Sequence, residues 1–180
     1  GSMLWTYMTG DIVQSTPAVA DIDSTHAGRE VVIGSADGYV YLLDKSGGLI
    51  WQRGTGWSVR SSPLVADVNG DGGLDIVVGG EDQYVWIWKS DGELLPGWPK
   101  ATGAPILSSP RLGDVDQDGV HDIVIGSDDS RVYAWRIDGS AIQGWPRDTT
   151  MSVKGAPALA NLDGDARLEV VAGDFGGQLY

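Results

Sequence analysis

The chain has 180 residues, of which 25 are acidic and 12 are basic, so its formal net charge at pH 7 is −13. This excess of negative charge argues against nucleic acid or an anionic membrane surface as a partner. No apolar run approaches the roughly 18 residues of a membrane span, and the absence of cysteine excludes disulfides and thiol chemistry. We therefore expect no membrane insertion and a single domain over residues 3–180, with residues 1–2 interpreted as a remnant of expression cloning.

The first stretch with strand character lies at residues 3–10. Residues 4–10 match residues 50–56 at an offset of 46, which is also the offset between Pro17 and Pro63. Residues 50–56 end a repeat, so the N-terminal stretch reads as the fourth strand of a unit whose first three strands do not precede it.

A repeat of about 47 residues follows and accounts for the rest of the chain. Each repeat starts at a proline that follows two small residues. The spacings are 46, 47 and 47 residues, at Pro17, Pro63, Pro110 and Pro157. After the proline come a short apolar stretch, an acidic loop, a β-branched run that ends near a glycine, a polar turn and two further strand-like runs. The last repeat stops at Tyr180, inside its third run.

Four short strands per repeat, with no helical periodicity, predict an all-β protein. Units of this length cannot bury both faces alone and must stack, as the blades of a β-propeller do. We expect blades at about residues 11–56, 57–103, 104–150 and 151–180, with residues 3–10 as the strand that completes the last blade. That pairing within one chain makes a four-bladed ring. Between two chains, head to tail, it makes a homodimeric eight-bladed ring, which suits the bulky Trp and Tyr positions better.

The acidic loops carry the chemistry of the sequence. Those beginning at positions 67, 114 and 161 contain three, four and three acidic residues, ten of the 25 in the chain. The loop at residues 67–75 has side-chain oxygens at positions 1, 3, 5 and 9 and glycines at positions 4, 6 and 7. Such a set suits a hard cation with six to eight oxygen ligands, which predicts calcium. Position 12 of an EF-hand loop would need a glutamate, and Val78 stands there instead.

Repeats two and three resemble the FG-GAP/VCBS repeats of integrin-α-type propellers. The resemblance rests on the Ser-Pro start, the D-x-[DN]-x-D-G-x-x-D loop and the I-V-[VI]-G run, and it extends over nearly the whole chain. It implies two calcium sites, with ligands from loop positions 1, 3, 5 and 9 and from the carbonyl of position 7. The first site would comprise Asp67, Asn69, Asp71, Asp75 and the Gly73 carbonyl, and the second Asp114, Asp116, Asp118, Asp122 and the Val120 carbonyl.

The other two loops depart from this pattern. The third site would use Asn161, Asp163, Asp165, Glu169 and the Arg167 carbonyl. We expect it to be weaker, because Ala166 replaces the turn glycine and Asn161 removes a charge. The loop at residues 21–30 is one residue longer and lacks a carboxylate at position 5, so we expect no metal there.

The resemblance implies a calcium-binding interaction or adhesion module of an extracellular or cell-surface protein, with a protein or glycan partner and structural calcium. The sequence has no G-x-S-x-G nucleophile elbow, no phosphate-binding loop and no Cys/His zinc-binding motif, so we do not expect an enzyme. Two alternatives stay open: a non-catalytic or catalytic propeller of a secreted polysaccharide-active enzyme, and a pyrroloquinoline-quinone-type propeller, which residues 38–51 resemble.

The aromatic residues are interpreted mainly as packing groups. Trp51, Trp98 and Trp145 recur at one repeat position, which favours contacts between blades over ligand contacts. Trp57 has no counterpart in the other repeats and is the better candidate for an exposed contact. His26 and His121 lie in acidic loops, but calcium prefers oxygen, so they are interpreted as bystanders.

Overall fold

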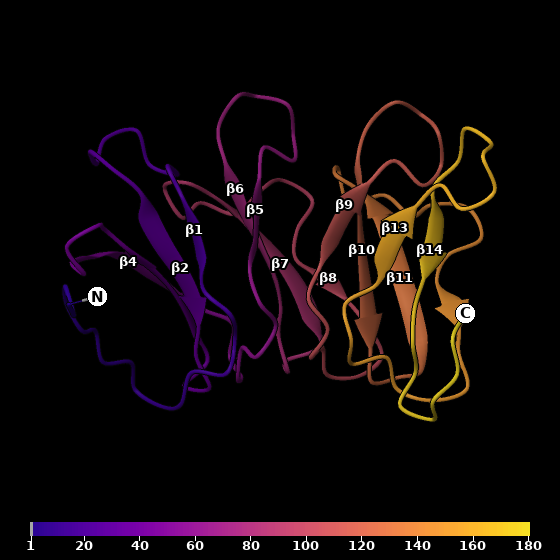
Figure 1. The fold of residues 1–180 in the computed structure, drawn as a ribbon, viewed down its shortest axis with the longest axis horizontal. Helices are drawn as coiled ribbons and strands as arrows, with labels where there is room; N and C mark the ends of the chain where they lie inside the picture. Colours follow the sequence, from indigo (N-terminus) through magenta and orange to yellow (C-terminus); the bar gives the residue numbers. More distant parts are fainter. Residues whose placement is uncertain (1) are drawn as a thin grey trace.

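The computed structural model describes residues 2–180, which form fourteen strands and four antiparallel sheets. No helix is present in this part of the chain, and so none that could cross a membrane. The sheets follow one another along the molecule in sequence order (Figure 1). The first sheet contains β1 (Ala18–Ala20), β2 (Glu30–Gly34), β3 (Tyr39–Leu43) and β4 (Leu49–Gly54). The second contains β5 (Leu64–Ala66), β6 (Asp75–Gly79), β7 (Tyr84–Lys89) and β8 (Lys100–Ala101).

The third and fourth sheets repeat this order. The third contains β9 (Arg111–Gly113), β10 (Asp122–Ser127), β11 (Arg131–Arg136) and β12 (Arg147–Asp148). The fourth contains β13 (Ala158–Ala160) and β14 (Glu169–Val171), and a single bridge between Gly173 and Leu179 extends it. The predicted four-repeat, all-β architecture is thus confirmed.

The cores lie between successive sheets and not within one sheet. Val32 and Leu42 of the first sheet pack with Ile76 and Val78 of the second. A second cluster joins sheets two and three, and a third joins sheets three and four. The second strand of each of the first three sheets is buried on both faces, which explains why its sequence is a continuous β-branched run without alternation.

Glycines at the ends of β2, β6 and β10 let neighbouring sheets approach closely. A Cβ added to Gly79 would lie 2.3 Å from Ile106, and one added to Gly126 would lie 2.3 Å from Val153. Gly34 faces Val59 in the same way, at 2.5 Å. Each of these facing side chains is fully buried, so the recurring glycine is a packing requirement of the sheet-to-sheet contact.

The fourth strands are shorter than the sequence predicts. The last strand-like runs of repeats two and three, residues 94–98 and 141–145, form only isolated bridges at Leu94 and Ala141, followed by the two-residue strands β8 and β12. In the second repeat Pro96 and Pro99 lie in this segment, and proline has no amide hydrogen with which to continue a ladder.

The N-terminal stretch differs most from expectation. Residues 3–9 form no strand and lie along the first sheet, where the Trp5 indole donates to the Lys45 carbonyl at 2.9 Å. The two termini lie at opposite ends of the row of sheets (Figure 1). The structure therefore does not bring this stretch to the fourth sheet of its own chain, and the four-bladed closure within one chain is not formed.

The glycine contacts predict a specific stability effect. Gly79→Ala should lower the free energy of unfolding by about 1–3 kcal/mol, because the added methyl group overpacks the contact with Ile106. Urea unfolding followed by tryptophan fluorescence measures the change. Gly173→Ala is the matched control and should be near neutral, since the nearest atom to its added Cβ is 3.8 Å away. Equal losses in both variants would contradict the packing explanation.

Candidate metal centre

The four acidic loops lie along one edge of the row of sheets, the upper edge in Figure 1, where each connects the first two strands of its sheet. The last carboxylate of each loop is also the first residue of the second strand. These residues are Glu30, Asp75, Asp122 and Glu169. The rigid inner strands therefore position one end of every loop.

This last carboxylate has the same backbone partner in all four repeats. One oxygen accepts from the amide of loop position 2, at 2.9 Å for Val115 N–Asp122 Oδ2 and 3.2 Å for Val68 N–Asp75 Oδ2. Ile22 N–Glu30 Oε2 and Leu162 N–Glu169 Oε2 are both 2.6 Å. The carboxylate thus ties the two ends of the loop together with one oxygen, and its other oxygen is left for a different partner.

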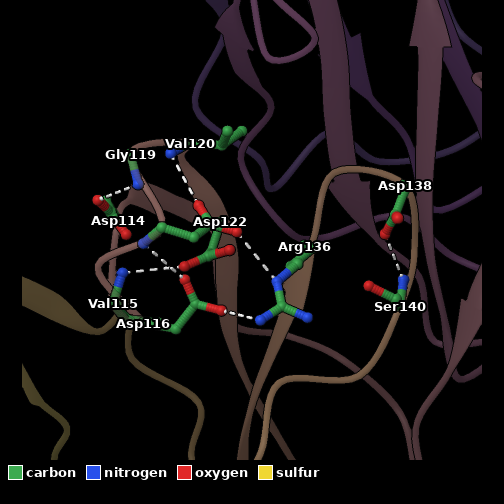
Figure 2. Close-up of polar contacts among 10 residues, drawn as sticks. Asp114, Val115, Asp116, Gly119, Val120, Asp122, Arg136, Asp138 and Ser140 are labelled. Atoms are coloured by element: carbon green, nitrogen blue, oxygen red, sulfur yellow. Dashed lines mark hydrogen bonds and ion pairs between the residues drawn. The ribbon is translucent and has the colours of Figure 1, made fainter.

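The loop at residues 114–122 gathers three carboxylates. Asp114, Asp116 and Asp122 each offer one oxygen, and these oxygens lie within 4.8 Å of one another (Figure 2). Asp114 Oδ1 and Asp122 Oδ1 are buried and have no hydrogen-bond partner among the described residues. Calcium–oxygen distances are about 2.3–2.6 Å, so oxygens at these separations fit one shared cation. Three of the predicted ligand residues are thus brought together, with a donor set that suits a hard cation, and the calcium assignment itself stays a prediction.

Asp118, the remaining predicted side-chain ligand of this loop, points elsewhere. Its Oδ1 accepts from the Val120 amide at 2.8 Å, and its Oδ2 accepts from Arg136 Nε at 3.1 Å. Arg136, from β11, also contacts Asp116 (Figure 2). A guanidinium therefore neutralises part of the carboxylate cluster. Sequence reasoning missed this residue, although the end of the third strand carries a cation in the second repeat too, at Lys89.

The loop at residues 67–75 is more strongly bound to its own backbone. Asp67 accepts from the Gly70 and Gly72 amides at 2.8 and 2.9 Å, while Asp71 accepts from the Gly73 amide at 2.8 Å and from Asn69 Nδ2 at 3.0 Å. In the described residues its three carboxylates do not converge as those of the next loop do. All five predicted ligand residues are in one loop, but side-chain oxygens of the other four, all except Gly73, accept from backbone amides.

The loop at residues 161–169, predicted to be weaker, does bring its acids together. Oxygens of Asp163, Asp165 and Glu169 lie within 4.8 Å of one another. Asn161 Oδ1 accepts from the Gly164 amide at 2.7 Å, and Asp165 Oδ1 accepts from the Arg167 amide at 2.6 Å. This loop is more exposed than the one at 114–122, so its carboxylates are less desolvated.

The loop at residues 21–30 folds around Asp23. Its Oδ1 accepts from the Thr25 amide at 2.9 Å and the Thr25 hydroxyl at 2.7 Å, and Oδ2 lies 2.7 Å from His26 Nδ1. These contacts, above all the hydrogen bond from the Thr25 hydroxyl, hold the pKa of Asp23 below its ordinary value. His26 is thus a local partner of a carboxylate, and the expectation that this loop takes no metal stays a prediction.

Burial and crowding disfavour ionisation of two loop carboxyls. Desolvation raises the pKa of Asp122 to about 6, and the neighbouring carboxylates of Asp116 and Asp118 add to the shift. Desolvation likewise raises the pKa of Asp75 to about 6, with contributions from Asp71 and Asp67. A bound divalent cation would favour the ionised forms and so reverse this effect.

A second polar feature, missed in the sequence, lies in the turn between the second and third strands. The Asp37 carboxylate accepts from the Tyr41 hydroxyl at 2.6 Å, and Asp129 accepts from the Tyr133 hydroxyl at 2.5 Å. Asp82 accepts from Trp86 Nε1 at 2.8 Å. Each aspartate lies three residues after the glycine that follows the β-branched run, so this recurring spacing could have identified the aspartates from the sequence.

The tryptophans divide as the sequence predicts. Trp51 and Trp98 are buried in the sheet-to-sheet clusters, and Trp145 packs against the third of them. Trp57 is 65% exposed. Arg60 pairs with Glu81 at 2.9 Å.

The raised pKa values predict how the metal-free protein responds to pH. A carboxyl with a folded pKa of about 6 and an ordinary value of 3.8 stabilises the fold below pH 4, and this contribution is lost as pH rises through 6. In chelator, Asp122→Asn should therefore lose less thermal stability between pH 4 and pH 7 than the parent chain. Asp91→Asn, in an exposed turn, is the control and should keep the parent slope. A parental slope for Asp122→Asn would contradict the shift.

Comparisons with known proteins agree with this architecture. Residues 67–125 match the model of the FG-GAP-like repeat. No curated protein matches the chain. Among solved structures, the computationally designed Ika4 protein aligns with 100% of this chain and 96% of its own, at 20% identity and a TM-score of 0.71. BamB from Moraxella catarrhalis aligns with 99% of this chain at 21% identity and a TM-score of 0.68.

A third structure, the V. cholerae biofilm matrix protein Bap1, aligns with 96% of this chain at 27% identity and a TM-score of 0.70. The chain spans 48% of the BamB chain and 26% of the Bap1 chain, so it is much shorter than either. The family match covers the second acidic loop and the one after it, and the structural matches cover all four sheets. The chain therefore contains FG-GAP-like repeat sequence, at residues 67–125, within a β-propeller fold.

Proposed function

We propose that this chain is a calcium-binding β-propeller interaction module of an extracellular or cell-surface protein. The observation that carries the calcium assignment is the cluster of Asp114, Asp116 and Asp122. Its carboxylate oxygens lie within 4.8 Å of one another, and two of its buried oxygens have no partner in the described chain. Buried carboxylates without partners are costly, and a hard cation with oxygen ligands is the partner that this set fits.

The other acidic loops support two further sites. The loop at residues 161–169 brings three carboxylates together, and the loop at 67–75 has the complete ligand sequence with its oxygens bound to amides. For calcium to bind at the 67–75 loop, Asp67 and Asp71 would have to give up hydrogen bonds to amides and coordinate the ion instead. We therefore rank the loop at 114–122 first in affinity.

Calcium would act structurally in this arrangement. Adjacent acidic loops face one another, because residues 67–70 and 119–121 line a shared cavity of about 290 Å³. Ions that order each loop would therefore order one continuous face of the row of sheets. Loops carried on a rigid scaffold are common positions for partner recognition, so we assign the interaction surface to this edge, with a protein or glycan as the partner class.

The extracellular assignment rests on affinity class and on one neighbour. Open loops with mixed Asp and Asn ligands suit the 10⁻⁴–10⁻³ M affinities of extracellular calcium modules. Bap1, at 27% identity, is described as a biofilm matrix protein. A glycan array probed with the calcium-loaded chain would separate glycan from protein partners.

Calcium should stabilise the fold measurably. With Kd values of 10⁻⁴–10⁻³ M, 10 mM calcium is a 10- to 100-fold excess and adds about 1.4–2.7 kcal/mol per site, so the melting temperature should rise in 10 mM calcium and fall in chelator. Calorimetry should show one site fewer in Asp116→Ala, a member of the convergent cluster, and in Asp71→Ala, whereas Thr25→Ala, in the loop expected to be empty, should lose none. A melting temperature that is the same in calcium and chelator would refute the proposal.

Arg136 should compete with calcium. Its guanidinium pairs with Asp116 and Asp118, so the ion must displace it or tolerate its charge. Arg136→Gln should therefore bind calcium at the 114–122 loop about 3- to 10-fold more tightly in titration calorimetry. Arg131→Gln, on the same strand but paired with Asp148, is the matched control and should leave affinity unchanged. Weaker binding by Arg136→Gln would show that the arginine supports the site.

A further inference from the structure

The N-terminal stretch makes the contacts of a fourth strand that belongs to a preceding sheet. In the first sheet-to-sheet contact, the Trp51 indole donates to the Ser90 carbonyl of the next sheet at 2.8 Å. In the second contact, Trp98 donates to the Ile137 carbonyl at 2.7 Å. Trp5 donates to the Lys45 carbonyl at 2.9 Å. The three tryptophans occupy one repeat position, and among the described residues 2–180 no sheet precedes Trp5.

The contacts that follow Trp5 repeat the same pattern. The Gly10 amide donates to Asp37 Oδ2 at 2.7 Å, as the Gly103 amide donates to Asp129 Oδ2 at 2.8 Å. The Ile12 carbonyl then accepts from the Ala36 amide at 2.9 Å. The corresponding Asp128 N–Pro105 O and Glu81 N–Ser58 O bonds are 3.0 and 2.9 Å. Residues 5–12 thus lie as the end of a preceding blade would lie.

The apolar outer face of the first sheet, against which this stretch packs, is only partly covered. Ile33, Tyr41 and Leu43 form a small cluster with Trp5 and Tyr7. The same face of the second and third sheets is covered by a complete preceding sheet. Three apolar side chains of the stretch remain largely in solvent at 81–92% exposure, and they are Met3, Leu4 and Met8.

The other end of the row has the complementary defect. The fourth sheet has β13, β14 and one bridge, with no outer strand in the described chain. Leu179 is 76% exposed, whereas Val132 at the same position of the third sheet is 3% exposed. Phe175 is also exposed. An uncovered sheet edge of this kind is a template for strand addition.

We propose that two copies of this chain associate head to tail, so that residues 4–10 of each copy form the outer strand of the other copy's fourth sheet. The termini lie at opposite ends of one chain (Figure 1), so its own stretch does not cap its own edge. A second copy presents the missing strand already seated on an apolar face. Two such contacts related by a twofold axis close the ring and leave no free edge.

The strand register of the other sheets agrees with this assembly. In the third sheet Val132 pairs with Arg147, and in the first sheet Val40 pairs with Arg53. Leu179 stands at the repeat position of Val132 and Val40, and Tyr7 stands at that of Arg147 and Arg53. The same register therefore places Leu179 opposite Tyr7 of the partner copy. Gln178 then lies opposite Met8 of the partner copy. The proposal goes beyond the calcium-binding function and does not depend on it.

Light scattering behind a sizing column tests the assembly directly. The 180-residue chain has a mass of 19.0 kDa, so the proposal expects about 38 kDa, both in calcium and in chelator. Leu179→Asp places a charge in the contact and should halve the mass. Leu94→Asp, at an exposed position of the second sheet, is the matched control and should stay at the dimer mass. A mass of 19 kDa for the parent chain at all concentrations overturns the proposal, and so does a ladder of larger species, which would show that the ring does not close.

Disulfide trapping tests the register without relying on the stability of a variant. The chain has no cysteine, so the pair Met8→Cys and Gln178→Cys introduces the only thiols. Directly opposed residues of antiparallel strands have Cα atoms about 4.5–5.5 Å apart, within disulfide range. Oxidation should yield a covalent dimer on a non-reducing gel. The pair Thr9→Cys and Gln178→Cys is one residue out of register and should cross-link at least tenfold less; equal cross-linking overturns the strand assignment.

Discussion

Face-to-face packing of successive sheets is the contact on which the rest of this structure depends. No sheet has a core of its own: the buried clusters span sheets one and two, two and three, and three and four. Close approach requires a glycine at or next to the end of β2, β6 and β10, as at Gly79 against Ile106. Because each sheet is buried only by its neighbours, stability is a nearest-neighbour property of the array. The same packing aligns the first two strands of every sheet and so brings the acidic loops to one edge.

The acidic loops show how the fold manages charge that it has concentrated. Backbone amides satisfy part of each loop's carboxylate oxygens, and the last carboxylate joins the two ends of the loop. What remains differs between repeats: Arg136 neutralises two aspartates at the 114–122 loop, while Asp122 is left buried with a pKa raised to about 6. A bound cation would offset the cost of burying these carboxylates. The Arg136 guanidinium would compete with that cation for Asp116 and Asp118. The calcium affinity of this loop would then depend on Arg136 of the neighbouring strand β11 as well as on the ligands themselves.

The ends of a stacked array raise a separate problem, because a repeat at either end lacks one neighbour. Here the first sheet carries a strand-like segment on its outer face, anchored by Trp5 and Gly10, and the fourth sheet has no such segment among the described residues. Exposed apolar groups such as Met8 and Leu179 mark both ends. Repeat proteins commonly need capped ends for solubility. Because the N-terminal segment has the sequence of the strand that the fourth sheet is missing, a segment of the repeat itself could cap that sheet.

Features encoded within a short stretch were predictable from the sequence. The β-branched runs, the acidic loops at one position per repeat and the buried Trp51 and Trp98 all follow from local periodicity, and the structure has them. The short outer strands do not follow from apolar alternation, because Pro96 and Pro99 have no amide hydrogen with which to continue the ladder. Only the tertiary structure decided which carboxylates converge, that Arg136 reaches its loop from another strand, and that the N-terminal stretch lies on the first sheet. Ligand spacing places oxygens in one loop, but their direction depends on amides and side chains of other strands, and contacts between segments far apart in the chain leave no local pattern to read.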